Sequence, residues 1–353
     1  MTELDKAFGG RSGKIRGLVD AVSLLTGKAR DHQSEFDEAL AQASDISTQL
    51  ARAQHTVDGY LDALPRLVAM LDIQRAKLQT LLASTTALAA ISTTQIGGLT
   101  KTQIGFLSTT AVQALSTTQV GALTSLQIGG LATTQINAFT TTVFASLTTT
   151  QVGALSVTQV KGLSTTNLNA LTTTQVAGLT TTSVTNLTTT QVGALTTTQV
   201  KSLTVTNIGA LTTGQASALT AAQVGALTST QVNAFTTTVI AGLSSVQISG
   251  LTTTQVAGLT TTKFGALSSS ELGYLSAAQI SAISTTDIAV LTTVQLGGLS
   301  SSQVGALTTT QVNALANNVV ASLTTAQLSG LTTTQIGGLS TTKFGALSSG
   351  ELG

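Results

Sequence analysis

The stretch of sequence that decides the fold is residues 187–202, which read L-T-T-T-Q-V-G-A-L-T-T-T-Q-V-K-S. It contains two copies of an eight-residue unit, and this octad continues in both directions without insertion or deletion. Thirty-two complete octads run from position 91 to position 346, and seven residues of another follow, ending at position 353. Such a regular short repeat predicts a solenoid, in which each unit packs on its neighbours.

Each of the eight positions admits few residue types. Position one is Leu except at Ile91, Phe139, Phe235 and Ile283, and position two is Ser or Thr except at Ala132 and Ala316. Gln fills position five in 21 of the 33 copies, and its substitutes include Asn167, Asn207, Glu271, Asp287 and Glu351. Position six is always apolar, and position eight is usually Ala, Gly or Ser.

The repeat length excludes one long helix. Eight steps of about 100° rotate each octad by about 80° from the last, which also fails the heptad spacing of a coiled coil. Two ordered architectures remain: a solenoid of short helices, one per octad, or a β-solenoid with a strand and a turn per octad. The abundance of Thr and Val favours strands, but strand propensity depends strongly on context.

Two helix-start signals fall on the same octad and favour the helical solenoid. Ser or Thr at position two, followed by Gln or Glu at position five, forms the capping box S/T-x-x-E/Q, as in Ser268 to Glu271 and Ser348 to Glu351. The apolar residues at positions one and six stand where a hydrophobic staple joins N′ to N4. Gly or Ala at positions seven and eight would let the chain leave the helix through a tight or left-handed conformation.

Two alternatives stay open at the level of sequence. A β-solenoid would stack the position-five side chains into a ladder. The presence of Lys263 and of acidic residues at that position is poorly explained by such a ladder. A disordered low-complexity tract is the other alternative, because one octad buries only two large side chains, worth about 1.5 to 3 kcal/mol each, against about 1.5 kcal/mol of ordering entropy per residue. Stacking of many units, with close approach over the small residues at position eight, must therefore supply the stability.

Residues 1–90 differ from the array in charge and pattern, so the sequence predicts two parts, a helical head at 1–90 and the solenoid at 91–353. The head holds 10 of the 15 Lys and Arg and 11 of the 14 Asp and Glu. Its apolar residues follow helical stripes, which predict a helical hairpin or a coiled coil that self-associates. The stripes are Ile15, Leu18, Val19, Val22 and Leu25; Phe36, Leu40, Ala43, Ile46, Leu50 and Ala53; and Leu61, Leu64, Leu67, Val68, Leu71 and Leu78.

Two resemblances accompany these patterns. The runs F-G-G-R-S-G-K-I-R-G-L-V-D-A-V-S-L-L and Q-L-A-R-A-Q-H-T-V-D-G-Y-L-D-A-L-P-R-L-V-A-M-L-D-I-Q-R-A-K-L lie within residues 8–90. They resemble the helical segment of actinobacterial mammalian-cell-entry (MCE) proteins, which implies a role in lipid carriage across the cell envelope. Residues 91–353 resemble the Thr- and Leu-rich repeats of large bacterial surface and adhesion proteins, which implies a structural or adhesive role.

Composition excludes several classes of function. Charged residues make up 8% of the chain, there is no Cys, and the formal net charge is +1. Few residues are therefore available for a metal site, a catalytic triad or an acid–base pair, and we expect neither an enzyme nor a cofactor. A nucleic-acid partner would need a basic stripe, which Lys101, Lys161, Lys201, Lys263 and Lys343 are too sparse to form. The sequence contains no run of 18 apolar residues, so it predicts no membrane span. The first residues lack a classical export signal.

Individual candidate residues have structural explanations. His32 and His55 lack the neighbours of a metal or catalytic site, so we expect them on the surface. The pairs Gly97–Gly98 and Gly129–Gly130 precede no G-K-S/T and are expected to end helices rather than bind phosphate. Asn186-Leu187-Thr188 is a lone glycosylation sequon.

The sequence thus predicts a non-enzymatic structural or adhesive repeat protein, with the solenoid as a stalk or contact surface. Its expected partners are a second copy, another protein or a surface, and its expected place is the cell surface or the extracellular space. One alternative is a lipid-handling envelope component related to MCE proteins. Another is ice binding, which requires that the T-T-T triplets form flat ranks on a β-solenoid.

Overall fold

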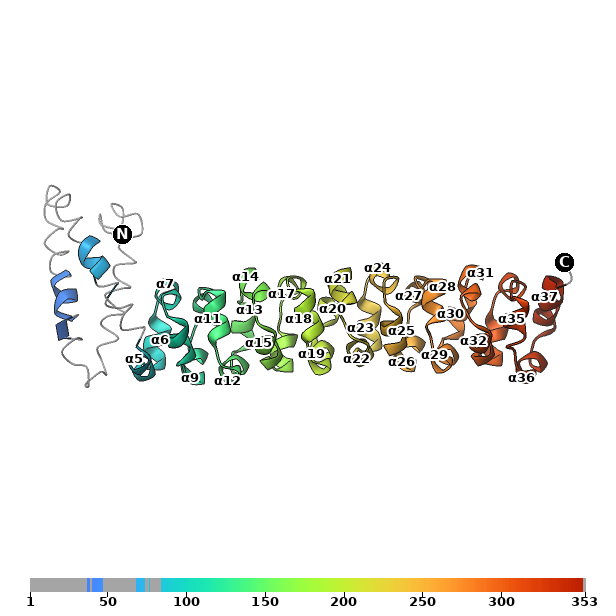
Figure 1. The fold of residues 1–353 in the computed structure, drawn as a ribbon, viewed down its shortest axis with the longest axis horizontal. Coiled ribbons are helices and arrows are strands. Elements are labelled where there is room, and N and C mark those ends of the chain that lie inside the picture. The colour runs from blue at the N-terminus through green and yellow to red at the C-terminus, as the bar shows by residue number, and fades with distance from the viewer. Residues whose placement is uncertain (1–36, 39, 47–67, 74–75, 77–83, 352–353) are drawn as a thin grey trace. The chain divides into compact units, whose positions relative to one another are not determined.

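The computed structural model describes residues 37–38, 40–46, 68–73, 76 and 84–351. Every regular element in this part of the chain is a helix, so the prediction of an all-α array is confirmed and the β-solenoid and the disordered tract are wrong for the described octads. The contacts divide the chain into two compact units, residues 1–171 and residues 172–353, which are described separately. Figure 1 follows the helices in chain order, from α5 to α37.

The helices are short and follow the octads one for one. In the first unit they are α5 (Thr85–Ala90), α6 (Thr93–Gly98), α7 (Lys101–Gly105), α8 (Thr109–Gln113), α9 (Thr117–Gly121), α10 (Ser125–Ile128), α11 (Thr133–Ala138), α12 (Thr141–Ala145), α13 (Thr149–Gly153), α14 (Val157–Lys161) and α15 (Thr165–Ala170). Helix α5 precedes the first octad read from the sequence, and its Leu88 is fully buried, so the repeat register already operates there.

The second unit continues the same pattern, and only its last helix is longer than one octad allows. Its helices are α16 (Thr173–Ala177), α17 (Thr181–Thr185), α18 (Thr189–Ala194), α19 (Thr197–Ser202), α20 (Val205–Gly209), α21 (Thr213–Ser217), α22 (Ala221–Ala226), α23 (Ser229–Ala234), α24 (Thr237–Ile240), α25 (Ser245–Gly250), α26 (Thr253–Ala257), α27 (Thr261–Gly265), α28 (Ser269–Gly273), α29 (Ala277–Ala282), α30 (Thr285–Ala289), α31 (Thr293–Gly297), α32 (Ser301–Ala306), α33 (Thr309–Ala314), α34 (Asn317–Val320), α35 (Thr325–Leu328), α36 (Thr333–Gly337) and α37 (Thr341–Glu351).

Helix α22 shows how one octad forms a helix. Thr220 is the N-cap in an extended conformation, and its Oγ1 accepts a hydrogen bond of 3.2 Å from the Gln223 N–H. The Thr220 N–H in turn donates to Gln223 Oε1 at 2.7 Å, which completes the predicted capping box. The helix ends where Leu227 returns to extended backbone and its N–H donates to the Val224 carbonyl at 3.2 Å.

Helix termination does not use the left-handed conformation that the sequence suggested. The helix-terminal residues Gly129, Gly162 and Gly178 have φ of −64°, −92° and −81°, so of the two expected exits, tight or left-handed, the left-handed one is wrong there. One octad is only about two turns of backbone long, and the position-one residue leaves the helix directly in extended conformation. The small residues serve close approach between coils instead.

Three octads, or 24 residues, make one coil of the solenoid in each unit. Helices three apart along the chain pack on each other and build three stacks per unit. In the first unit α5, α8, α11 and α14 form one such stack; in the second, α16, α19, α22 and α25 follow one another in the same way. Side chains therefore form hydrogen bonds with residues 25 to 31 positions away, in an adjacent coil.

Positions one and six fill the interior, as the staple predicted. In octad 219–226, Leu219 is 3% exposed and Val224 is fully buried, and this pattern holds through nearly all the described octads. The largest fully buried side chains are Phe144, Phe235 and Phe264. Because each short helix has no stability of its own, this apolar interior and the contacts between coils hold the array together.

The described parts of the head are helical, as expected. In residues 40–46, Ala43 and Ile46 are buried, whereas Leu40 is 40% exposed. In residues 68–73, Val68 is 54% exposed within the single chain, and the predicted self-association of its stripe stays a prediction. The first predicted stripe and the hairpin or coiled coil lie outside the described residues.

Candidate functional site

Position five is the chemically distinctive feature of the array. The sequence assigned its Gln and Glu to the capping box and did not predict that this position is buried. The structure instead buries this position: Gln223, Gln247 and Gln255 are each 2% exposed. A buried amide must find partners for both its oxygen and its nitrogen, because an unsatisfied buried polar group costs about 1–3 kcal/mol.

Gln223 shows how both halves of the amide are used. Its Oε1 accepts from the N-cap N–H of its own octad, and its Nε2 donates to two carbonyls of the preceding coil. These are Leu195 O at 2.6 Å and Val192 O at 3.1 Å, which lie 28 and 31 residues earlier in the chain. One side chain therefore starts its own helix and binds the backbone of the coil on which that helix rests.

The same two-carbonyl pattern recurs along both units. It is made by Gln119, Gln127, Gln135, Gln151, Gln159, Gln215, Gln247, Gln255, Gln279, Gln303, Gln311, Gln327 and Gln335. We call this set the glutamine ladder. Glu would cap equally well but has no N–H, so the predominance of Gln over Glu was the sequence signal that could have revealed the ladder.

The substitutes at position five keep part of this chemistry. Lys263 and Lys343 donate from Nζ to the carbonyls of Phe235 and Leu315, again 28 residues earlier, but offer no acceptor to their own N-caps. Asp287 is 1% exposed; its Oδ2 accepts from the hydroxyl of the N-cap residue Ser284 at 2.7 Å, rather than from the Ser284 N–H as in a capping box.

An Asn in the preceding coil replaces the missing acceptor. Oδ1 of Asn233 accepts from the N–H of Thr260, the N-cap of the Lys263 octad, at 2.8 Å. Nδ2 of the same Asn donates to Gly258 O at 2.6 Å. Asn313 makes the equivalent bonds to Ser340 N and Gly338 O beside Lys343, and Asn137 makes them to Ser164 N and Gly162 O beside Asn167. These three asparagines, which we call the asparagine bridges, occupy position seven and were not recognised in the sequence.

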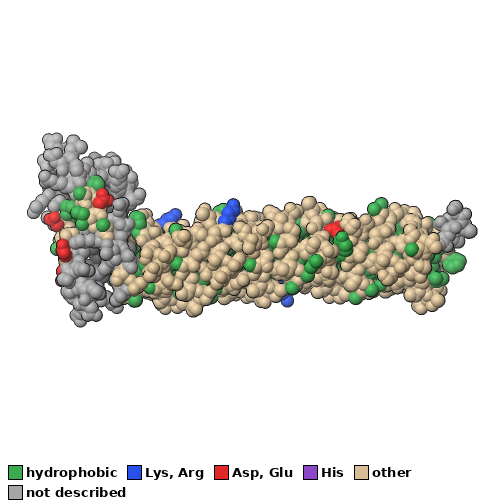
Figure 2. All heavy atoms as spheres, viewed as in Figure 1, with side chains coloured by type: hydrophobic (Ala, Val, Ile, Leu, Met, Phe, Trp, Pro, Cys, Tyr) green, Lys and Arg blue, Asp and Glu red, His purple; other side chains and the backbone are tan. Residues whose placement is uncertain are grey.

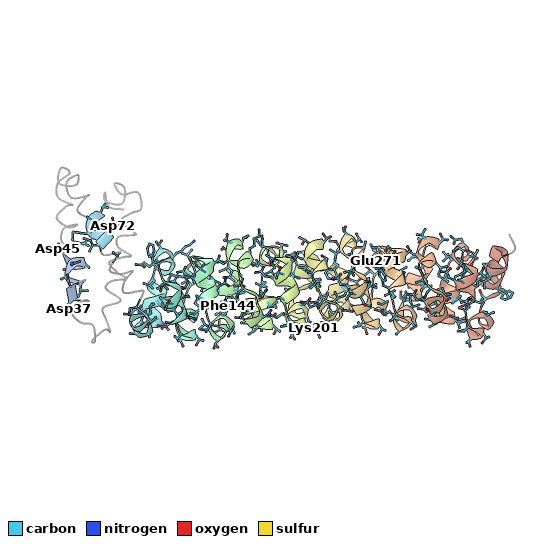
Figure 3. The ribbon with its side chains drawn as sticks, in the orientation of Figure 1. Asp37, Asp45, Asp72, Phe144, Lys201 and Glu271 are labelled. Carbon is cyan, nitrogen blue, oxygen red and sulfur yellow. The ribbon has the colours of Figure 1, made fainter. Side chains whose placement is uncertain are left out.

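Two buried side-chain atoms of the described residues have no hydrogen-bond partner. They are Gln103 Nε2 and Glu271 Oε1. The residue 28 positions before Gln103 is position 75, which lies outside the described residues. Glu271 lies on α28, is 5% exposed and is labelled in Figure 3.

The other residues considered in the sequence are not brought together. His32 and His55 lie outside the described residues, and no cluster of three metal-ligating side chains occurs within the described part. Lys101, Lys161 and Lys201 are exposed. The pairs Gly97–Gly98 and Gly129–Gly130 lie at the ends of α6 and α10, as expected.

The sequon Asn186-Leu187-Thr188 is built into the repeat. Asn186 Nδ2 donates to the Thr182 carbonyl at 2.9 Å, and Leu187 is buried. The Thr188 hydroxyl caps α18 by accepting from Gln191 N. Each of the three residues therefore has a role inside the folded array.

The outer surface of the octads is formed largely by Ser and Thr. Positions three and four of most octads are exposed, and most of the array surface in Figure 2 is neither charged nor hydrophobic. In one stack of the second unit, position four is an exposed Thr in four successive coils: Thr182, Thr206, Thr230 and Thr254. These four residues are the hydroxyl row. Because the triplets begin helices, the described octads do not form the flat β ranks that the ice-binding alternative requires.

Comparison with known proteins supports the repeat assignment. Five segments match the family model of the ALTTAQ repeat: residues 104–133, 129–165, 151–181, 229–261 and 280–317. The six letters of that name follow the order of positions eight, one, two, three, four and five in this chain, as in A-L-T-T-T-Q at residues 194–199. The chain is thus similar to a repeat family over less than half of its length.

The remaining comparisons yield no relatives. No curated protein and no solved structure matches the chain. The mammalian-cell-entry resemblance has no family match, and most of residues 8–90 lies outside the described part, so it stays a prediction. Within the described part of the chain, none of the helices has the length and apolar character needed to cross a bilayer.

Proposed function

We propose that this chain is a non-enzymatic structural repeat protein whose solenoid serves as a stalk or adhesive contact surface at the cell surface or outside the cell. The observation that carries this proposal is how the octad uses its positions. Positions one and six form the interior, position two caps the helix and position five joins coils. Positions three and four are the main ones left on the outside, and their side chains expose mainly hydroxyl and methyl groups.

Such a surface suits contact through many weak, similar interactions. Thr offers one donor, two acceptor lone pairs and a methyl group, and the hydroxyl row repeats this group once per coil. Several equivalent contacts on one rigid body gain from a high effective concentration, so weak individual contacts add to firm attachment. A partner with repeated hydroxyl or amide groups, such as a polysaccharide or a second copy of the chain, matches this chemistry.

Bead attachment tests the contact surface directly. Beads coated with the full chain are allowed to settle on cellulose, on a hydrocarbon-coated surface and on a layer of the same chain, and shear-resistant attachment is counted. We expect attachment to cellulose or to the layer of the same chain. Replacing all four Thr of the hydroxyl row by Glu should abolish it, whereas replacing the same four by Ser should preserve it.

Two outcomes would contradict the proposal. Attachment to none of the three surfaces would remove the adhesive role, and equal attachment by the Glu and Ser variants would show that the hydroxyl row is not the contact surface. Stoichiometric lipid in the purified chain, or saturable binding of a fluorescent fatty acid, would instead favour the lipid-handling alternative.

A further inference from the structure

One junction between coils in the second unit combines several departures from the octad pattern. It lies between α25 and α28, where α28 carries Glu271 in place of the ladder Gln. The capping half is intact: the Ser268 N–H donates to Glu271 Oε2 at 2.6 Å, and the Glu271 N–H donates to Ser268 Oγ at 3.2 Å. The other carboxylate oxygen, Oε1, is buried and has no partner.

The register of the ladder identifies what Oε1 should meet. Residues 28 and 31 positions before Glu271 are Leu243 and Ile240, and in the neighbouring octads the carbonyls at these offsets accept from the Gln amide. A carboxylate oxygen has no hydrogen to donate to a carbonyl. The bond between coils is therefore missing here, and a buried polar oxygen remains without a hydrogen-bond partner.

A second substitution acts on the same junction. Position eight of this stack normally lies against the preceding coil, since a Cβ on Gly250 would come within 2.7 Å of Ala221 O and one on Gly298 within 2.1 Å of Ser269 O. At α28 this position is Tyr274, which is 47% exposed. Contact between α25 and α28 is sparse. The neighbouring pairs of the same stack, α22 with α25 and α28 with α31, pack closely.

We propose that the α25–α28 junction is a built-in opening point of the second unit, at which the two coils separate before any other part of this unit unfolds. A missing amide bond, a buried unpaired oxygen and a bulky residue at a close-approach position all weaken the same junction. Because a solenoid's stability is the sum of its units and interfaces, its weakest interface sets the free energy of local opening. Opening there would expose interior residues such as Leu243 and Leu272.

Hydrogen exchange measured by mass spectrometry on the full chain tests this inference. Peptides that flank the junction, within residues 240–250 and 267–275, should exchange at least ten-fold faster than peptides at the α19–α22 junction, within 192–202 and 219–226. The variant Glu271→Gln should restore the ladder and slow exchange at the α25–α28 junction by about ten-fold or more, a factor that corresponds to one regained buried hydrogen bond. Ser270→Ala, at an exposed neighbouring position, is the matched control and should change nothing.

The reciprocal variant keeps the inference testable even if Glu271→Gln alters the fold. Gln223→Glu places the same defect at a regular junction of the same stack and should accelerate exchange there by a similar factor. Tyr274→Ala should slow exchange at the α25–α28 junction by permitting closer approach. Equal protection at both junctions in the unmodified chain, or no response to both Glu271→Gln and Gln223→Glu, would overturn the inference.

Discussion

At the scale of single residues, the buried amide at position five does the work of two groups. In Gln255, Oε1 accepts from the Thr252 N–H at 2.7 Å, and Nε2 donates to Val224 O at 2.8 Å and Leu227 O at 2.6 Å. A side-chain amide carries an acceptor oxygen and a nitrogen with two donor hydrogens on the same carbon. This explains why Gln predominates even though many residue types can cap a helix.

Replacing this amide by an apolar group of similar size should be costly. Gln255→Leu keeps the volume but leaves the N-cap N–H and the two carbonyls without their partner. We expect a loss of about 2 to 5 kcal/mol in the free energy of local unfolding, measured by hydrogen exchange at residues 219–258. Thr254→Ala, an exposed change one residue away, is the control and should alter protection little. Comparable loss in both variants would contradict the ladder.

The asparagine bridges predict an energetic coupling across 30 residues of sequence. Asn233→Ala should cost about 1 kcal/mol when position 263 is Lys, because the Thr260 N–H loses its acceptor. In a Lys263→Gln background the Gln oxygen can cap Thr260 itself, so the same change should cost less. A double-mutant cycle from chemical denaturation measures the coupling. Additive effects of the two changes would show that the bridge does not replace the Gln acceptor.

At the scale of the element, each helix is too short to persist alone, so its stability comes from the staple and from its neighbours. Leu195 is 4% exposed and Val200 is fully buried, in the N′ and N4 positions of α19. Leu195→Ala should therefore cost about 2 to 5 kcal/mol through lost burial and the cavity that remains.

The loss of stability from Leu195→Ala should stay local, because the stability of a solenoid is a sum of separate contributions from its units and interfaces. Hydrogen exchange should show lost protection in the coils around α19, with the remaining coils of the second unit unchanged. Thr198→Ala in the same helix replaces an exposed side chain and provides the control. Unfolding of every octad after the Leu195 change would contradict the additive description.

Close approach between helices explains the small residue at position eight. A Cβ on Gly298 would lie 2.1 Å from the Ser269 carbonyl oxygen, whereas a Cβ on the adjacent Gly297 meets nothing within 4 Å. Gly298→Ala should therefore destabilise the α28–α31 junction by about 1 to 3 kcal/mol. Gly297→Ala should be neutral or should stabilise by about 0.5 to 1 kcal/mol, because Ala favours helix more than Gly. Thermal denaturation of the two single variants separates the effects; a loss in both would indicate that backbone conformation, not space, requires glycine.

At the scale of the whole molecule, the array can be shortened by whole coils of 24 residues without changing which stack each remaining octad belongs to. Deleting residues 203–226 removes three octads and leaves each later octad in its original stack. Deleting the single octad 243–250 moves the later octads to the next stack and separates Asn233 from Thr260.

We therefore expect the 24-residue deletion to retain the helical circular dichroism and the cooperative melting of the parent chain. The eight-residue deletion should retain helix content but lower the melting temperature, because the bridge to the Lys263 octad is lost. Adding Lys263→Gln to the eight-residue deletion should recover part of this loss. Equal melting temperatures for the two deletions would contradict the three-octad coil.

Much of this architecture follows from the octad itself. The period of eight excluded a single helix, and the coincidence of capping box and staple predicted one short helix per octad and a buried position six. These devices act over three or four neighbouring residues, so their geometry is encoded locally and can be read from one copy. The composition likewise indicated that few residues are available for catalysis.

Only the tertiary structure decided which octads meet. The number of octads per coil depends on how the short helices pack, and no residue within one octad records it. That number places Gln223 against Val192 and Leu195, joins Asn233 to Thr260, and leaves Glu271 Oε1 without a donor. The burial of position five and the weak junction at α28 depend on contacts between residues about 30 positions apart, and such contacts exist only once the coil has closed.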